Sequence, residues 1–296
     1  MNYLNNEQIK KRFLEIDLAK GVAVMCMMFF HYFYLGNYMN VHSFPTSSGI
    51  LSLMAKIAHT IFIFASGANL AISVHNKIPK NYIPKKTKRG LFLLATGLII
   101  SYLTKQEFGE HYVKFGILHF IGSATILSSL IIRLPMIVAA SAISILLIHI
   151  LLTSNFAFKN QFNDMCQSNP FMCFISGIMN IKYYSMDHFS LIPYLGYFLM
   201  GSAIAFVLYK INVVQNELNE IDNKPVERKY KWLGYFDQYK DNPAVKIIGW
   251  IGKRSLLFYV THFIILYCIF KIIQIHSIPE AVSVPTVPVN PVPQTI

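Results

Sequence analysis

The chain has 296 residues, of which 54% are hydrophobic and only 14% are charged. An ordinary soluble domain carries about 25% charged residues, so a water-soluble fold of this composition would lack the polar surface to cover itself. The mean hydropathy is +0.44, and apolar runs long enough to span a bilayer alternate with short polar stretches. The net charge of +12 comes from basic residues between these runs, which indicates membrane orientation and lipid contact rather than a nucleic-acid-binding face.

The apolar runs predict an all-α fold, a polytopic transmembrane helix bundle of about seven spans. In chain order, the predicted spans are residues 18–35, 50–74, 90–103, 116–132, 135–152, 191–209 and 255–275. We expect residues 1–278 to form a single integral-membrane domain. Residues 279–296 repeat Val-Pro pairs and are predicted to be a disordered tail.

The basic residues predict the orientation of the spans. If seven spans alternate, the basic residues at positions 10–12, 77–89, 133 and 210–254 all fall on one side of the membrane. The opposite side holds only Lys105, Lys114, Lys159 and Lys182. Since cytoplasmic loops carry the excess of Lys and Arg, we expect the N-terminus to lie in the cytoplasm.

Two connections are long. The stretch 153–190 is expected outside; it holds a semi-apolar piece, 171–179, that is too short to span. Cys166 and Cys173 in this stretch could form a disulfide in an oxidising compartment. The stretch 211–254 is expected inside as a polar connection, with aromatic side chains available for the headgroup region.

Ionisable side chains inside a span are costly and point to function. The first predicted span carries Asp17, Lys20 and His31 on one helical face. Lys20 and His31 are separated by three turns, or about 16 Å along the helix axis. The alternative is that Asp17 and Lys20 reach toward the headgroups and His31 is a packed histidine.

The second predicted span carries a polar stripe at helical spacing: Lys56, His59, Ser66, Asn69 and Ser73. A stripe of this kind is unstable against lipid, so it must face protein or a wet cavity. The alternative to a functional cavity is hydrogen bonding between helices.

Polar groups also mark three later elements. His119 and Ser123 share a face of the fourth predicted span, and Asp187 precedes the sixth. Tyr259 and His262 share a face of the seventh. The alternatives are a packed interfacial histidine, a helix cap and helix–helix contact, respectively.

Together these residues predict one bipolar site. His31, His59 and His119 lie toward the outer half of the bilayer, with Asp187 beyond them, and a carboxylate beside an imidazole can orient a general base. The cytoplasmic ends carry Lys20 and the basic cluster at 85–89, which suit phosphate groups. The pattern fits a phosphorylated donor held from the cytoplasm.

Six motifs in order carry a resemblance to a known family. They are Arg12-x-x-x-Ile16-Asp17-x-x-Lys20-Gly21 running on to His31, Phe62-x-Phe64-x-Ser66-Gly67, Lys86-x-Lys88-Arg89, Gly116-Ile117-Leu118-His119, Asp187-x-Phe189-x-Leu191-Ile192-Pro193, and Ile251-Gly252-x-x-Ser255-Leu256-x-x-Tyr259-x-x-His262. The chain resembles the transmembrane acyltransferase superfamily. Within it, the chain is similar to bacterial relatives of the heparan-alpha-glucosaminide N-acetyltransferase catalytic-domain family, which is related to acyltransferase-3.

The resemblance implies transfer of an acetyl group from cytosolic acetyl-CoA to an extracytoplasmic hydroxyl or amine, on a carbohydrate or lipid-linked acceptor. It implies a location in the bacterial inner (plasma) membrane and no metal cofactor. Acyltransferase-3 proteins have about ten spans, so the shorter bundle predicted here leaves open a partner or a homodimer.

On this hypothesis the site residues have three roles. The catalytic group is His31, as general base or transient acyl carrier, with His119 and Asp187 orienting it or binding the acceptor. The phosphates of acetyl-CoA are held by Lys20, Lys86, Lys88 and Arg89. The residues expected to line the cavity are Asp17, His59, Ser66, Asn69, Tyr259 and His262. Two alternatives are a proton-coupled transporter or flippase of a polar solute or lipid-linked sugar, and a noncatalytic assembly subunit.

Overall fold

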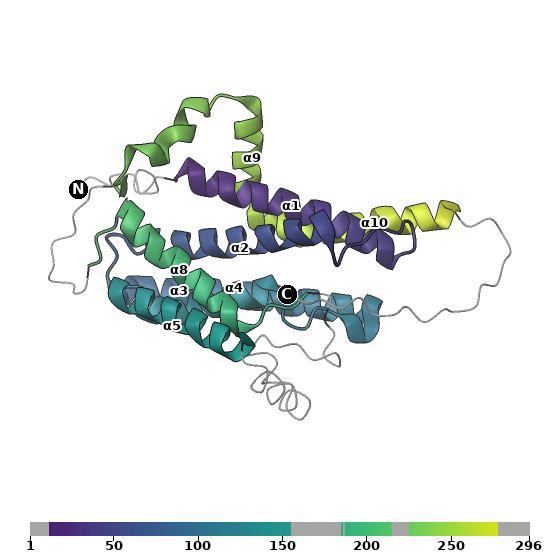
Figure 1. Ribbon diagram of the computed structural model, residues 1–296, viewed down its shortest axis with the longest axis horizontal. Helices are drawn as coiled ribbons and strands as arrows, with labels where there is room; N and C mark the ends of the chain where they lie inside the picture. The colour runs from purple at the N-terminus through teal and green to yellow at the C-terminus, as the bar shows by residue number, and fades with distance from the viewer. Residues whose placement is uncertain (1–11, 155–184, 186, 215–224, 278–296) are drawn as a thin grey trace, which may run out of the picture. The chain divides into compact units, whose positions relative to one another are not determined.

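The computed structural model describes residues 12–154, 185, 187–214 and 225–277 (Figure 1). The longer helices of the described residues are α1 (Leu14–Tyr38), α2 (Gly49–Ile72), α3 (Pro79–Phe108), α4 (Ile117–Ile131), α5 (Pro135–Ser154), α8 (Leu191–Leu208) and α10 (Ser255–Ser277). The shorter elements are η1 (Gly109–His111), β1 (Tyr209–Lys210), β2 (Glu227–Arg228), η2 (Lys231–Tyr239) and α9 (Pro243–Lys253). The predicted mostly helical class is confirmed.

Each predicted span coincides with one of the longer helices. Five helices in the described part of the chain, α1, α2, α5, α8 and α10, are long and apolar enough to cross a membrane. Helix α4 is apolar but has only 15 residues. Helix α3 has 30 residues and starts eleven positions before the predicted span, with a proline in its first turn and a lysine-rich N-terminal part that hydropathy alone does not register.

The described later part of the stretch 211–254, residues 225–254, contains secondary structure that the hydropathy pattern did not predict. It contains β2, which pairs antiparallel with β1, then η2 and α9. Asn242 caps α9 by accepting a hydrogen bond from the N–H of Ala244 at 2.9 Å, and Pro243 opens the helix. A hydropathy average over a bilayer-length window does not detect a helix as short as α9. Cys166, Cys173, the piece 171–179 and the tail 279–296 lie outside the described residues.

The chain divides into two compact units. The terminal unit consists of Phe13–Phe62 and Phe236–Ile296, and it contains α1, the first half of α2, α9 and α10. The central unit consists of Met1–Arg12 and Ile63–Tyr235, and it contains the second half of α2 together with α3, α4, α5 and α8.

In the terminal unit, α1 and α9 lie with their backbones in close approach. A Cβ added to Gly252 would stand 1.7 Å from the carbonyl oxygen of Asp17, and one added to Gly21 would stand 2.1 Å from that of Ile248. Val24 and Met27 of α1 form a core with Ala58 of α2, covered by side chains from α9 and α10. Small residues therefore hold α1 against α9, while larger apolar residues join α1 to α2 and α10.

In the central unit, α8 packs on α2 by the same device. A Cβ added to Gly67 would stand 1.9 Å from the carbonyl oxygen of Phe198, and one added to Gly201 would stand 2.2 Å from that of Phe64. The buried Ser202 Oγ donates a hydrogen bond to the Gly67 carbonyl oxygen at 2.8 Å. Helices α3 and α4 pack together, as do α5 and α8, which lie side by side in Figure 1.

Candidate functional site: two histidine centres

The first centre is a histidine pair in the terminal unit. His31 of α1 and His262 of α10 lie with Nδ1 of His31 3.2 Å from Nε2 of His262. His262 is only 4% exposed, and His31 is half-buried. The two residues are 231 positions apart in the chain, and the packing of α10 on α1 brings them together.

The hydrogen-bond network assigns the tautomer of each ring. Nδ1 of His262 lies 2.9 Å from the carbonyl oxygen of Phe258 and 2.8 Å from that of Tyr259. Carbonyl oxygens only accept, so Nδ1 of His262 carries the hydrogen and Nε2 of the neutral ring is an acceptor. Nδ1 of His31 lies 3.0 Å from the carbonyl oxygen of Met27 and faces that acceptor Nε2, so it donates. The lone pair of His31 is therefore on Nε2.

Aromatic side chains surround this pair. The rings of Phe30 and Phe263 approach His31 with centroid distances of 5.6 and 5.9 Å. The ring of Tyr259 lies 5.8 Å from that of His262. His59 of α2 is close enough to interact electrostatically with His31. The apolar wall limits water around the imidazoles, which strengthens each hydrogen bond that they make.

Two polar residues near the start of α1 are buried. Asp17 is 7% exposed and Lys20 is 9% exposed, although Lys20 was expected to present a charge to a phosphate. The carbonyl oxygen of Asp17 is the group against which Gly252 packs. Helix α1 thus carries its buried ionisable groups at one end and His31 three turns further on.

The second centre lies at the start of α4 in the central unit. His119 is 4% exposed, and its Nε2 lies 3.4 Å from Oγ of Ser101. Ser101 donates its hydrogen to the carbonyl oxygen of Val113 at 2.5 Å, so its oxygen can accept from His119. The imidazole packs on Gly97, where an added Cβ would stand 2.8 Å from Nδ1. This geometry gives His119 a packing role between α3 and α4.

Asp187 lies at the same helix end. Its Oδ2 accepts a hydrogen bond from the N–H of Ile117 at 3.3 Å, in the first turn of α4. A Cβ added to Gly116 would stand 2.7 Å from that oxygen, so glycine makes room for the carboxylate. Asp187 therefore stabilises the N-terminus of α4, where a negative charge is favourable.

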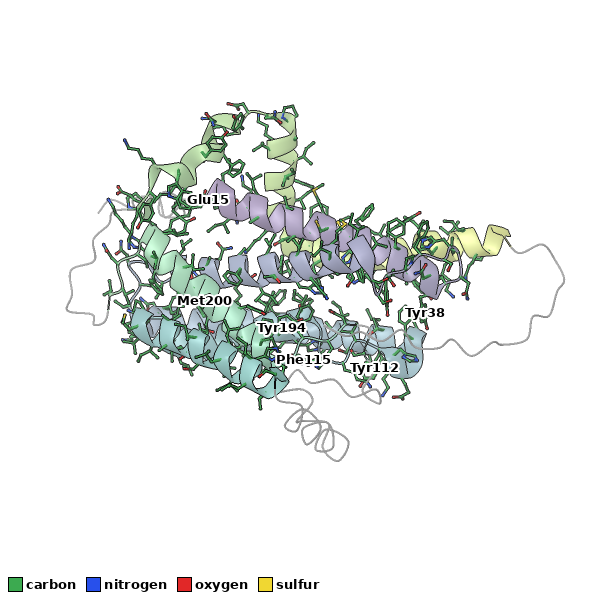
Figure 2. All side chains as sticks on the ribbon, viewed as in Figure 1. Glu15, Tyr38, Tyr112, Phe115, Tyr194 and Met200 are labelled. Atoms are coloured by element: carbon green, nitrogen blue, oxygen red, sulfur yellow. The ribbon has the colours of Figure 1, made fainter. Side chains whose placement is uncertain are left out.

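A short junction holds Asp187 in place. The Oγ of Ser185 accepts from the N–H of Lys114 at 3.0 Å and donates to the carbonyl oxygen of Asp187 at 2.8 Å. The N–H of Phe189 donates to the carbonyl oxygen of Phe115 at 2.9 Å. Figure 2 labels Phe115 in this junction and Tyr194 in the adjoining first turn of α8.

His188 belongs to the same junction and was not assigned a role from the sequence. Burial lowers the pKa of His188 to about 4, and the nearby charge of Lys114 lowers it further. The ring is therefore neutral at physiological pH. Its position directly after Asp187 was the one sequence signal available.

The predicted basic residues lie on the first turns of α3. Lys88 and Arg89 are exposed, and Lys86 is half-buried with its Nζ 5.4 Å from the ring centroid of Tyr82. Burial lowers the pKa of Lys86 to about 7, and the charges of Arg89 and Lys85 add to the effect. The positive charge at this end of α3 therefore comes mainly from its exposed neighbours, Lys85, Lys88 and Arg89.

The polar stripe of α2 divides between the two units. His59 lies in the terminal unit, while Ser66 and Asn69 lie in the central unit. Ser66 is half-buried and Asn69 is exposed. In the Ser66-Gly67 pair the glycine has a direct structural role, because it admits the backbone of α8. No cluster of His, Cys, Asp or Glu able to hold a metal ion occurs among the described residues.

The comparison with protein families gives one match. The model of the heparan-alpha-glucosaminide N-acetyltransferase catalytic domain matches residues 12–264. Neither the search of curated proteins nor the search of solved structures found a match. The match spans most of the chain and runs from the start of α1 to two residues past His262, and it agrees with the resemblance seen in the six motifs. The chain therefore belongs to the heparan-alpha-glucosaminide N-acetyltransferase catalytic-domain family, a family of membrane acetyltransferases.

Proposed function

We propose that this protein transfers an acetyl group from cytosolic acetyl-CoA to an extracytoplasmic hydroxyl or amine, on a carbohydrate or lipid-linked acceptor. The observation that supports this proposal most directly is the His31–His262 pair, which leaves a lone pair on Nε2 of His31 in an aromatic surrounding. Family membership supports the acetyltransferase class and the acetyl-CoA donor.

In the proposed reaction, His31 is the general base. Its Nε2 takes the proton from the acceptor as the acceptor oxygen or nitrogen attacks the thioester carbonyl carbon. The bond from that carbon to sulfur then breaks, and the proton passes to the thiolate of coenzyme A. The Nδ1–H of His31 donates to Met27 or His262 throughout, which holds the ring orientation and stabilises the imidazolium.

The same lone pair supports a second route. Nε2 of His31 could attack the thioester carbonyl, expel the thiolate and carry the acetyl group to the acceptor. Both routes need the same tautomer and orientation, so both depend on His262 as a positioning residue. The two routes differ in whether acetyl-histidine forms without an acceptor, which a single-turnover reaction can detect.

The other predicted residues take binding roles in this proposal. Lys20, Lys86, Lys88 and Arg89 hold the phosphates of acetyl-CoA. Ser66, Asn69, His59 and Tyr259 line the path of the substrates. Asp187 and His119 shape the start of α4, where the acceptor is proposed to approach.

The test is to replace His31 by alanine in the full chain, purified in nanodiscs. A general base contributes about 10²–10⁴-fold to the rate, so thiol release from acetyl-CoA with glucosamine as acceptor should fall by that factor. Calorimetric binding of acetyl-CoA should stay within a few-fold of wild type. His149→Ala removes a histidine of α5 outside both centres and should retain activity.

A His31→Ala variant with full turnover would exclude His31 as the base or carrier. If well-folded wild type binds no acetyl-CoA at all, the acetyltransferase proposal fails. The transporter and the noncatalytic subunit are then the favoured alternatives. The binding measurement therefore separates an error about the residue from an error about the reaction.

A further inference from the structure

A buried arginine lies at the turn between α4 and α5. Arg133 is 7% exposed, and its Nη1 donates a hydrogen bond to the carbonyl oxygen of Lys77 at 2.7 Å. Its Nη2 is also buried and has no hydrogen-bond partner among the residues that the structure describes. A guanidinium offers five N–H donors, and leaving a buried charged donor unmatched is costly. In the sequence, Arg133 contributed only to the prediction of how the spans are oriented in the membrane.

The neighbours of Arg133 do not neutralise it. Tyr82 of α3 interacts electrostatically with Arg133 and donates its hydroxyl hydrogen to the carbonyl oxygen of Leu70 at 3.4 Å. Burial raises the pKa of Tyr82 to about 12, although Ser73 and Arg133 act to lower it, so the phenol stays neutral. Tyr82 is thus a polar neighbour without a charge.

A second basic side chain, Lys86, lies beside the same tyrosine. Lys86 Nζ lies 5.4 Å from the ring centroid of Tyr82, and Arg89 and Lys85 are near enough to repel Lys86. Within the described ranges, none of Lys86, Arg89 and Arg133 pairs with a carboxylate.

Packing of α3 on α4 explains why these groups meet. Gly90 of α3 contacts Gly122 and Ile126 of α4, where an added Cβ would stand 2.8 Å from the Gly122 carbonyl oxygen and 2.4 Å from Ile126. The two helices are joined by a short connection and run in opposite directions. Arg133 lies about two turns beyond Ile126, and Tyr82 lies about two turns before Gly90, so Arg133 reaches the level of Tyr82.

We propose that Arg133, together with Lys86 and Arg89, forms a phosphate-binding site at this end of the central unit. Arg133 and Lys86 both lie beside Tyr82, and Arg89 lies near Lys86. A group of basic side chains without an acid calls for an anion, and the planar fork of an arginine matches the oxygens of a phosphate. The assignment of that phosphate to coenzyme A rests on the proposed function; the site itself does not. Arg133 is then the buried anchor of the site, Lys86 is half-buried and Arg89 is exposed.

The test uses the full chain in nanodiscs of zwitterionic phosphatidylcholine and measures binding by calorimetry. The probes are coenzyme A, dephospho-coenzyme A, which lacks the 3′-phosphate, and inorganic pyrophosphate. Arg133→Gln keeps a polar side chain but removes the charge, and it should weaken coenzyme A and pyrophosphate by about tenfold to a hundredfold. Lys105→Gln, which removes one charge from the opposite end of α3, should bind all probes as wild type does.

Dephospho-coenzyme A identifies which phosphate is bound. If Arg133→Gln weakens coenzyme A but leaves dephospho-coenzyme A unchanged, Arg133 holds the 3′-phosphate. If both ligands weaken equally, it holds the diphosphate. Should Arg133→Gln fail to fold, as judged by gel filtration and thermal unfolding, Lys86→Gln and Arg89→Gln test the same site, and each should weaken pyrophosphate severalfold.

A lipid headgroup is the other source of a phosphate, and native mass spectrometry in the presence of phosphatidylglycerol distinguishes it. In one outcome, wild type retains this lipid, Arg133→Gln loses it, and the affinity for coenzyme A is the same in both proteins. The phosphate site then stands, but its assignment to coenzyme A is overturned. If Arg133→Gln, Lys86→Gln and Arg89→Gln bind every probe and the lipid as wild type does, the phosphate site is overturned. If wild type binds pyrophosphate through Arg133 but no coenzyme A, only the proposed function fails.

Discussion

At the scale of single residues, the chemistry proposed for His31 depends on which nitrogen carries its proton. Two carbonyl oxygens hold the Nδ1–H of His262, and His262 in turn presents an acceptor to Nδ1 of His31. The chain of hydrogen bonds from the α10 backbone to His31 resembles the orienting role of the carboxylate in a Ser-His-Asp triad. Here a neutral imidazole takes that place, and its own tautomer is set by the backbone.

We expect replacement of His262 to lower kcat while KM for acetyl-CoA stays nearly unchanged. His262→Ala removes the acceptor opposite Nδ1 of His31, so kcat should fall by about tenfold to a hundredfold. His262→Gln can place its amide oxygen near the lost Nε2 and should recover part of that rate. Steady-state kinetics of thiol release measure both parameters.

A merely structural role for His262 would give a different result. Both variants would then lose protein stability together, and the remaining folded enzyme would keep its kcat. Thermal unfolding of each variant, measured beside the kinetics, separates these outcomes.

The residue scale also shows where sequence reasoning was incomplete. Asp187 and His119 were expected to assist His31, and that role stays a prediction. In the structure both residues have structural contacts at the start of α4. Asp187 accepts a hydrogen bond from the Ile117 N–H, and the His119 ring packs on Gly97. A capping carboxylate and a catalytic carboxylate look the same in a sequence, because only the partner distinguishes them.

At the scale of secondary-structure elements, close helix contact depends on glycine. Helix α9 carries two glycines on the side toward α1, but they differ in the space around them. A Cβ on Gly252 would stand 1.7 Å from the carbonyl oxygen of Asp17, whereas one on Gly249 would stand 3.4 Å from Leu14 Cδ1. The first is a steric collision with backbone, and the second is an ordinary contact.

The two glycines therefore give a matched pair of variants. Gly252→Ala should force α9 away from α1 and destabilise the protein by roughly 1–3 kcal/mol, as overpacking does. Gly249→Ala adds the same methyl group to the same helix and should be neutral or slightly stabilising, because alanine favours helix over glycine by about 1 kcal/mol. Thermal unfolding in detergent compares them. Equal melting temperatures for the two variants would contradict the close packing of α1 and α9.

The short elements near and within the stretch 211–254 show what hydropathy does not detect. Hydropathy finds bilayer-length helices because each carries its own signal over about 18 residues or more. Helix α9 has 11 residues, and β1 and β2 have two residues each. Their formation depends on caps, on strand partners and on contact with α1, and none of these is a property of composition.

At the scale of the whole molecule, the predicted orientation in the membrane rests on the distribution of basic residues. The basic residues at positions 77–89, at Arg133 and at 210–254 fall on one predicted side, and the phosphate site proposed at Arg133 needs that side to face cytosolic coenzyme A. The orientation of the chain and the proposed donor site are therefore linked.

Cysteine labelling tests this orientation. In a chain whose four cysteines are replaced, Lys105→Cys and Lys80→Cys place single thiols at opposite ends of α3, both at exposed positions. A membrane-impermeant maleimide applied to intact cells should label position 105 and spare position 80. Labelling of both after the cells are broken is the control. The reverse pattern would place the N-terminus outside and would exclude a cytosolic donor at Arg133.

Several properties of this protein can be predicted from local features of its sequence. Composition and apolar runs determined its membrane character and the positions of seven helices, and ordered motifs determined its family, because hydropathy, helical periodicity and motif spacing need no knowledge of distant residues. Which polar residues meet was decided by the tertiary structure. Helix packing places His31 beside His262, Asp187 at the start of α4 and Arg133 beside Tyr82. Such contacts depend on where glycines let backbones approach, and that is a property of pairs of helices rather than of either helix alone.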